Sequence, residues 1–128
     1  MAEVLFYNIK NPEKLRRLRA VLLRQGIAGR AVRYEEYGHP IGYLTGYEGF
    51  APAGPYTGED FTDEMLLLDG FTSGELSRFL DALRAARAAV ALKAVVTEHN
   101  APWTSAELHA AVKEEHETMR ELRERKGK

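Results

Sequence analysis

The chain has 128 residues, a formal net charge of −1 and no cysteine. This length favours a single domain, and the absence of cysteine excludes a disulfide framework, a thiolate metal site and thiol catalysis. Because the charge is near zero and no segment approaches the ~20 apolar residues of a membrane span, we expect a soluble cytoplasmic domain that binds neither nucleic acid nor membrane.

The first third of the chain has the pattern strand, helix, strand. Residues 3–9 form an apolar run typical of a strand. Asn11 and Pro12 match a helix N-cap followed by proline at the first helical position, and Gly26 stands where a helix end adopts a left-handed conformation. Residues 27–34, which include charged arginines, predict a weaker strand at a sheet edge.

Residues 35–60 differ from the rest of the chain because they are dense in glycine, proline and tyrosine. Loops of this length without regular structure are uncommon, and they are usually functional or disordered. The aromatic residues argue against plain disorder, and a helical turn is expected at residues 41–44. Tyr43, Tyr47 and Tyr56 either pack this loop onto the sheet or line a pocket.

The stretch from Phe61 to Asn100 is the unit around which the chain is organised. Its apolar run at residues 65–68 suits a strand that is buried on both faces. Thr72 and Glu75 then form a capping-box pattern that predicts the start of a helix, and residues 92–96 predict the second strand.

Thr104 and Glu107 repeat the capping-box pattern and predict a helix from Ser105 to Arg125. The repeat reflects either convergence on a good cap or duplication of a unit. The end of the chain, residues 117–128, is a charged helical tail. It is either a frayed, solvated helix end or a self-association surface. A thin apolar seam runs along this helix through Leu108, Val112, Met119 and Leu122.

Two strand–helix–strand units and a terminal helix predict one α/β domain over residues 1–128. We expect a four-stranded, mainly parallel sheet in the order 2-1-3-4 with three helices, which is a Rossmann-like or flavodoxin-like half fold. Right-handed connections would put the first helix on one face and the other two on the opposite face. Ligands of such sheets bind beyond the carboxyl ends of the strands, where the strand order reverses.

That rule predicts a single ligand-binding edge where the strands end. Two helix N-termini would point to it and favour a small anionic ligand, with the glycine- and tyrosine-rich loop folded over it. The alternative is that the polar residues only cap their own helices. The residues that we expect to bind the ligand are Asn8, Asn11, Tyr43, Asp69, Gly70, Thr72, Thr97, His99 and Asn100.

No spacing of residues in the sequence is typical of a catalytic site. Neither of the two glycine-rich nucleotide fingerprints follows the first strand. A phosphoacceptor domain needs acidic residues at that place, where Asn8 stands instead. His99 beside Glu98 and near Asp69 is the closest approach to a metal site. Ser73, His99 and Asp69 are the residue types of a catalytic triad, but the sequence gives no geometry for them. We predict no metal site, and the sequence defines neither a catalytic residue nor a cofactor.

Several segments of the chain resemble one known family. The segments VLFYNI, HPIGYLTG, DEMLLLDGF, LKAVVT and WTSAELHAAVKEEHE occur in this order. Together they resemble the domain-of-unknown-function family catalogued under number 3783, which consists of small bacterial proteins. The resemblance runs from roughly Val4 to Glu117. It implies a one-domain α/β fold, and because the family has no established activity it supplies no catalytic residues.

The sequence leads to three hypotheses of function. The first is a non-enzymatic domain that binds a small anionic molecule or has a regulatory role. The second is a protein-interaction module or homodimer that uses the C-terminal helix and the aromatic loop. The third is an enzyme of unknown type that uses Asp69, Glu98 or His99, and no spacing supports it over the other two.

Overall fold

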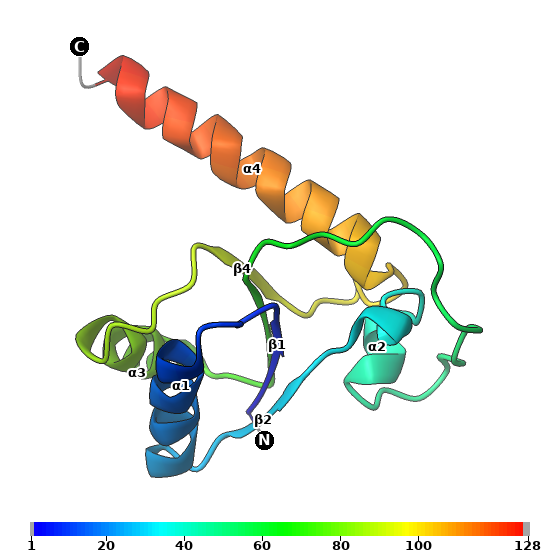
Figure 1. Cartoon of the computed structure of the whole chain (residues 1–128), viewed down its shortest axis with the longest axis horizontal. Coiled ribbons are helices and arrows are strands. Elements are labelled where there is room, and N and C mark those ends of the chain that lie inside the picture. The colour runs from blue at the N-terminus through cyan, green and yellow to red at the C-terminus, as the bar shows by residue number, and fades with distance from the viewer. Residues whose placement is uncertain (1, 127–128) are drawn as a thin grey trace.

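The structure is a computed structural model that describes residues 2–126 (Figure 1). It contains a four-stranded sheet in the order β2-β1-β3-β4, as predicted. The strands are β1 (Glu3–Tyr7), β2 (Ala28–Ala31), β3 (Met65–Asp69) and β4 (Leu92–Val95). The helices are α1 (Pro12–Arg24), α2 (Ile41–Leu44), α3 (Ser73–Ala85) and α4 (Ser105–Lys126), and a short 3-10 turn, η1 (Tyr34–Glu36), precedes α2.

Local sequence signals fix where the long helices begin. The side chain of Asn11 accepts hydrogen bonds from the backbone N–H groups two and three residues further on. Thr72 and Glu75 bond reciprocally to each other's backbone N–H groups, and Thr104 and Glu107 do the same at α4. The predicted caps are confirmed, because each one satisfies N–H groups that have no partner inside their own helix.

The two central strands run antiparallel. β1 pairs in parallel with β2 and β3 with β4, but Val4 lies opposite Leu68 and Phe6 opposite Leu66 in an antiparallel register. The prediction of a mainly parallel sheet is therefore wrong, and the sheet is mixed. It differs from a Rossmann-like or flavodoxin-like half fold, in which the central strands are parallel.

The connection between the two units explains this reversal. β2 ends at Ala31, which lies beside Phe6, and β3 begins at Met65, which lies beside Tyr7. The intervening residues 32–64 therefore leave and rejoin the sheet at the same end. They contain only η1 and the four-residue α2, whereas parallel strands are joined by a long crossover that returns to the opposite end.

The reversal also moves α3 to the face of the sheet that α1 covers. A right-handed connection fixes the side of its helix relative to the strand direction, so inverting the second unit within the sheet plane changes that side. The expected separation of these two helices onto opposite faces is wrong, and they lie side by side (Figure 1). The strand residues buried under them are Val4, Phe6, Leu66 and Leu68.

The opposite face is covered by α4, α2 and the aromatic part of residues 32–64. Tyr37 is 1% exposed, and its ring stacks on Phe61 with centroids 4.6 Å apart. Phe61 in turn stacks on His109 of α4 at 3.9 Å, and Tyr56 packs against Tyr37. The aromatic residues at this end of the loop therefore pack it onto the sheet, because burying aromatic area stabilises a segment that has little regular structure.

Asp63 joins the end of this loop to α4. Its Oδ2 atom lies 2.8 Å from Nε2 of His109 and 3.2 Å from Nζ of Lys113. The hydrogen bond from His109 lowers the pKa of the Asp63 carboxyl the most, and the hydrogen bond from Lys113 is the second cause.

Among residues 2–126, no helix combines the length and the apolar composition that crossing a membrane requires.

We expect the Asp63→Asn variant to be less stable than the wild type at pH 7, by under about 1 kcal/mol, because the side chain is partly exposed. A carboxyl with a lowered folded pKa stabilises the fold above its unfolded pKa of about 4, and that contribution disappears as the pH falls through the folded pKa. The difference should therefore shrink below about pH 4 in urea unfolding followed from pH 7 to pH 3. Asp81→Asn, at an exposed pair with Arg84, is the matched control. A difference that does not depend on pH would contradict this interpretation.

Candidate functional site: a cleft at the carboxyl end of β4

The antiparallel centre separates the residues that were predicted to share one edge. Glu3 lies opposite Asp69, and Tyr7 lies opposite Met65. Asn8 therefore follows β1 at one end of the sheet, whereas Asp69 ends β3 at the other. The expected single edge is wrong, and Asn8 and Asn11 lie apart from the rest of the set. The residues that follow β3 and β4 share one end, because these two strands are parallel.

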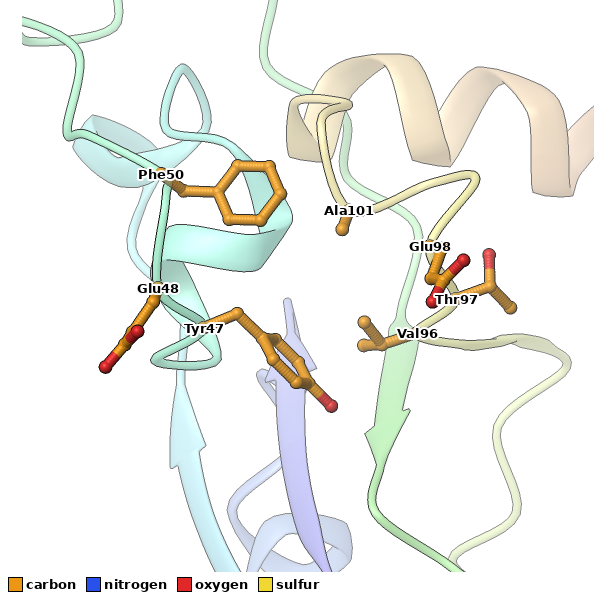
Figure 2. A pocket seen from close by; sticks show the side chains of 7 residues that line it. All are labelled: Tyr47, Glu48, Phe50, Val96, Thr97, Glu98 and Ala101. Atoms are coloured by element: carbon orange, nitrogen blue, oxygen red, sulfur yellow. The ribbon is translucent and has the colours of Figure 1, made fainter.

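A cleft of about 820 Å³ opens at this second end of the sheet. Figure 2 shows the rings of Tyr47 and Phe50 projecting from one wall toward Val96 and Ala101 on the other. Thr97, Glu98 and Glu48 complete the lining. The first wall comes from the glycine- and tyrosine-rich loop, and the second from the turn between β4 and α4.

The second wall is a turn that polar side chains hold from within. Asn100 accepts a hydrogen bond from the backbone N–H of Thr97 at 2.9 Å, and the Thr97 hydroxyl accepts one from the backbone N–H of Asn100 at 3.2 Å. The amide nitrogen of Asn100 also donates to the carbonyl of Val95. Because Asn100 is buried and both its side-chain oxygen and its side-chain nitrogen are hydrogen-bonded, it shapes the cleft without lining it.

The first wall depends on the absence of a side chain at Gly42. A Cβ atom at this position would lie 2.4 Å from the ring of Phe50, so only glycine lets that ring lie flat against the buried turn of α2. The backbone N–H of Tyr47 donates to the carbonyl of Gly42 at 2.8 Å. Position 42 therefore contacts both aromatic residues of the wall, and the Phe50 ring is the one that requires glycine there.

The two walls are hydrogen-bonded to each other at their base. The backbone N–H of Gly42 donates to the carbonyl of Ala101 at 2.8 Å, and that of Ile41 donates to the carbonyl of Trp103 at the same distance. Pro40 and Thr104 form an isolated bridge beside them. These contacts fix the spacing of the walls, so the cleft is formed before any ligand arrives.

Carboxylates lie near the cleft. The hydroxyl of Tyr47 donates to Oδ1 of Asp69 at 2.6 Å, and this hydrogen bond raises the pKa of Tyr47. Burial, and then the charge of Asp69, raises the pKa of Glu3 in the neighbouring strand. Figure 2 shows Glu98 on the side of Thr97, while Glu48 points away from the gap. Among the described residues that line the cleft, none is basic.

The other predicted residues have contacts of their own. The hydroxyl of Thr72 and the amide of Asn11 serve as caps. Tyr43 packs edge-on against the ring of His39, and His99 packs edge-on against Trp103. Gly70 has a φ of +75°, which suits a turn. Of the nine predicted residues, only Thr97 lines the cleft, and Asp69 reaches it through Tyr47.

Asn8 holds the other end of the molecule together. Its side-chain nitrogen donates to the carbonyls of Phe61 and Asp63 at 2.8 and 3.1 Å, and its own φ is +59°. It borders a smaller hollow of about 410 Å³ that also includes Lys10 and Arg33. Asparagine suits this position because it tolerates the left-handed conformation better than most residues do.

Phe50, Val96 and Ala101 were not anticipated as lining residues. The density of glycine and tyrosine marked the loop, and Tyr47 was one candidate for a pocket, but no local pattern indicates which loop residues face the turn after β4. That pairing depends on a contact between segments that are at least 46 positions apart in the chain. Among residues 2–126, no group of three or more histidine, cysteine, aspartate or glutamate side chains is arranged to hold a metal ion.

The comparison with protein families gives one match. The model described as "Domain of unknown function (DUF3783)" matches residues 64–119. Over these residues, which make up less than half of the chain, the protein is similar to the DUF3783 family. The resemblance noted from the sequence is thereby confirmed over that range, which holds β3, α3, β4 and most of α4. No curated protein and no solved structure matches the chain.

The DUF3783 segment supplies only one wall of the cleft. Val96, Thr97, Glu98 and Ala101 lie within it, whereas Tyr47 and Phe50 lie outside it. The aromatic wall is therefore contributed by the part of this chain that precedes the matched segment.

We expect Asn8→Ala to be more destabilising than Asn8→Gly. Both variants lose the hydrogen bonds to residues 61 and 63, worth about 1 kcal/mol each, but alanine also adopts the left-handed conformation at a cost of about 1 kcal/mol. Urea unfolding of the two variants measures the difference. Asn11→Gly is the control and should cost only a few tenths of a kcal/mol. Equal effects of the two Asn8 variants would contradict the role of its backbone conformation.

Proposed function

We propose that this domain binds a small organic molecule in the cleft, without catalysis, and so acts as a binding or regulatory module. The observation that carries the proposal is a pair of aromatic rings, Tyr47 and Phe50, facing the apolar Val96 and Ala101 across an open gap. Ligand sites in proteins are typically apolar and aromatic clefts of about 300–1,000 Å³ with a few polar groups at the edge.

The hydrogen bonds between the walls support binding, because a preformed cleft does not lose free energy to ordering when the ligand enters. Tyr47 is 48% exposed. A ligand that covered its ring would bury apolar area that the domain otherwise leaves in water, at about 25 cal/mol for each Å².

The carboxylates favour a neutral or cationic ligand over the anion that the helix N-termini suggested. Glu98 stands on one wall, and Asp69 lies behind Tyr47. A second negative charge in this partly enclosed space would be repelled, whereas a planar cation would be attracted both by these groups and by the aromatic faces. We therefore propose a planar or amphipathic molecule that carries an amine or another donor group.

A matched panel of planar amines, neutral analogues and carboxylates tests this function. We expect a rise in melting temperature with amines and neutral compounds and none with carboxylates. Phe50→Ala should weaken binding about threefold to tenfold by removing an aromatic contact worth about 0.5–1.5 kcal/mol, and Glu98→Gln should weaken only the amines. Leu23→Ala, at an 84% exposed position on α1, is the control. The proposal fails if no compound shifts the transition or if Phe50→Ala leaves binding unchanged.

Gly42→Ala gives a second test of the same cleft. The added methyl group would meet the Phe50 ring, so the ring must leave its place, and ligand affinity should fall by at least as much as in Phe50→Ala. Overpacking of this kind also costs about 1–3 kcal/mol of stability, which chemical unfolding measures separately. Gly54→Ala is the matched control, because a Cβ atom there meets nothing within 4 Å. Unchanged affinity in Gly42→Ala would show that the ring position is irrelevant.

A further inference from the structure

The second half of α4 extends away from the domain. The helix has 22 residues, which corresponds to a length of about 33 Å. Leu108 and His109 near its start are buried, whereas every residue from 117 to 125 is exposed. Figure 1 shows this part of the helix projecting beyond β4 with no other element beside it. About two fifths of the helix is therefore exposed to solvent.

Apolar side chains continue along this exposed part of the helix. Met119 is 50% exposed and Leu122 is 44% exposed. Together with Val112, which packs into the domain, they repeat at spacings of seven and three residues, the pattern of a helix that pairs with another helix. A short helical segment is only marginally stable by itself in water, so covering this seam would stabilise both the side chains and the helix.

A groove leads from the domain to this seam. It has a volume of about 230 Å³ and lies between the start of β4 and one side of α4. Its lining residues are Ala91, Lys93, Val112, Glu115, His116, Met119 and Arg123. A helix laid along α4 would therefore contact the exposed seam at one end and the groove at the other.

The order of charges along α4 identifies the occupant. Residues 113–118 contain three glutamates and one lysine, whereas residues 119–126 contain four basic residues and two glutamates. A second copy lying antiparallel would bring its basic part alongside the acidic part of the first, in both directions at once. A parallel copy would oppose like charges. We propose that two copies of this chain associate through antiparallel packing of their α4 helices, in a register that puts Met119 of each copy against Leu122 of the other.

The edge of β4 is a poorer surface for self-association. This strand has four residues, and the ammonium group of Lys93 donates to the carbonyls of Val90 and Ala91 just before it. Short edge strands that carry lysine resist pairing with another sheet. The proposed contact therefore runs along the helix and does not extend the sheet.

Sedimentation equilibrium of the full chain over a concentration series tests the association. The wild type should approach twice the monomer mass of 14.4 kDa, and Leu122→Asp should raise the dissociation constant at least tenfold. Leu23→Asp is the matched control, since Leu23 is also an exposed helical leucine but lies on α1, and it should leave the association unchanged. At concentrations well below the wild-type dissociation constant, circular dichroism should show the same domain melting in all three proteins.

A wild type that stays monomeric at the highest concentration would overturn the proposal and leave the seam to a different protein or to a lipid surface. An unchanged dissociation constant in Leu122→Asp would overturn it as well. The charge preference has its own readout, because the wild-type dissociation constant should rise with salt concentration, and a constant that did not change would contradict the charge argument.

Single cysteines determine the orientation, because the natural chain has none. In the antiparallel register, position 118 of one copy lies near position 125 of the other. A short thiol cross-linker should therefore join Thr118→Cys chains to Arg125→Cys chains in a mixture and should not join Thr118→Cys chains to each other. Cross-linking of Thr118→Cys alone would indicate a parallel pair and would overturn the proposed arrangement.

Discussion

The antiparallel pairing of β1 with β3 is the constraint on which the rest of the structure depends. It joins two units whose internal pairing is parallel, and its buried residues, such as Leu5 and Leu67, are in register across the centre of the sheet. Because each unit keeps a right-handed connection, this one choice of direction puts α1 and α3 together on one face. It leaves the other face to α4 and the aromatic loop. The same choice sends the carboxyl ends of the two units to opposite ends of the molecule.

The two ends of the sheet differ in structure. Beyond β1, the chain is tied down by Asn8, whose side chain binds the carbonyls of residues 61 and 63. Beyond β4, the turn that starts at Thr97 and the α2 region meet through two backbone hydrogen bonds and leave an open cleft. The segment matched by the DUF3783 model contains one unit and most of α4. In this chain β1, which belongs to the first strand–helix–strand unit, pairs with β3. The loop that follows this unit forms the aromatic wall of the cleft.

α4 shows two environments along one helix. One face of its first turns, which carries Leu108, His109 and Val112, packs against the aromatic cluster around Phe61 and the strand residues of the sheet. Its last turns carry a narrow apolar seam among charges. A helix that is apolar on such a narrow stripe is typical of pairing with a second helix and not of packing on a sheet. This contrast links the fold to the proposed self-association, and it is independent of the cleft.

The sequence by itself determined what depends on near neighbours in the chain. The caps at Asn11, Thr72 and Thr104, the buried strands and the strand order follow from hydrogen bonds and apolar spacing within a few residues or from simple rules of connection. The direction of β3 relative to β1 was decided only by the tertiary structure. A buried apolar run such as residues 65–68 packs equally well in either direction, because side-chain alternation has no sense along the strand. The cleft also depends on the tertiary structure, since its walls come from segments far apart in the chain that meet only once the sheet has formed.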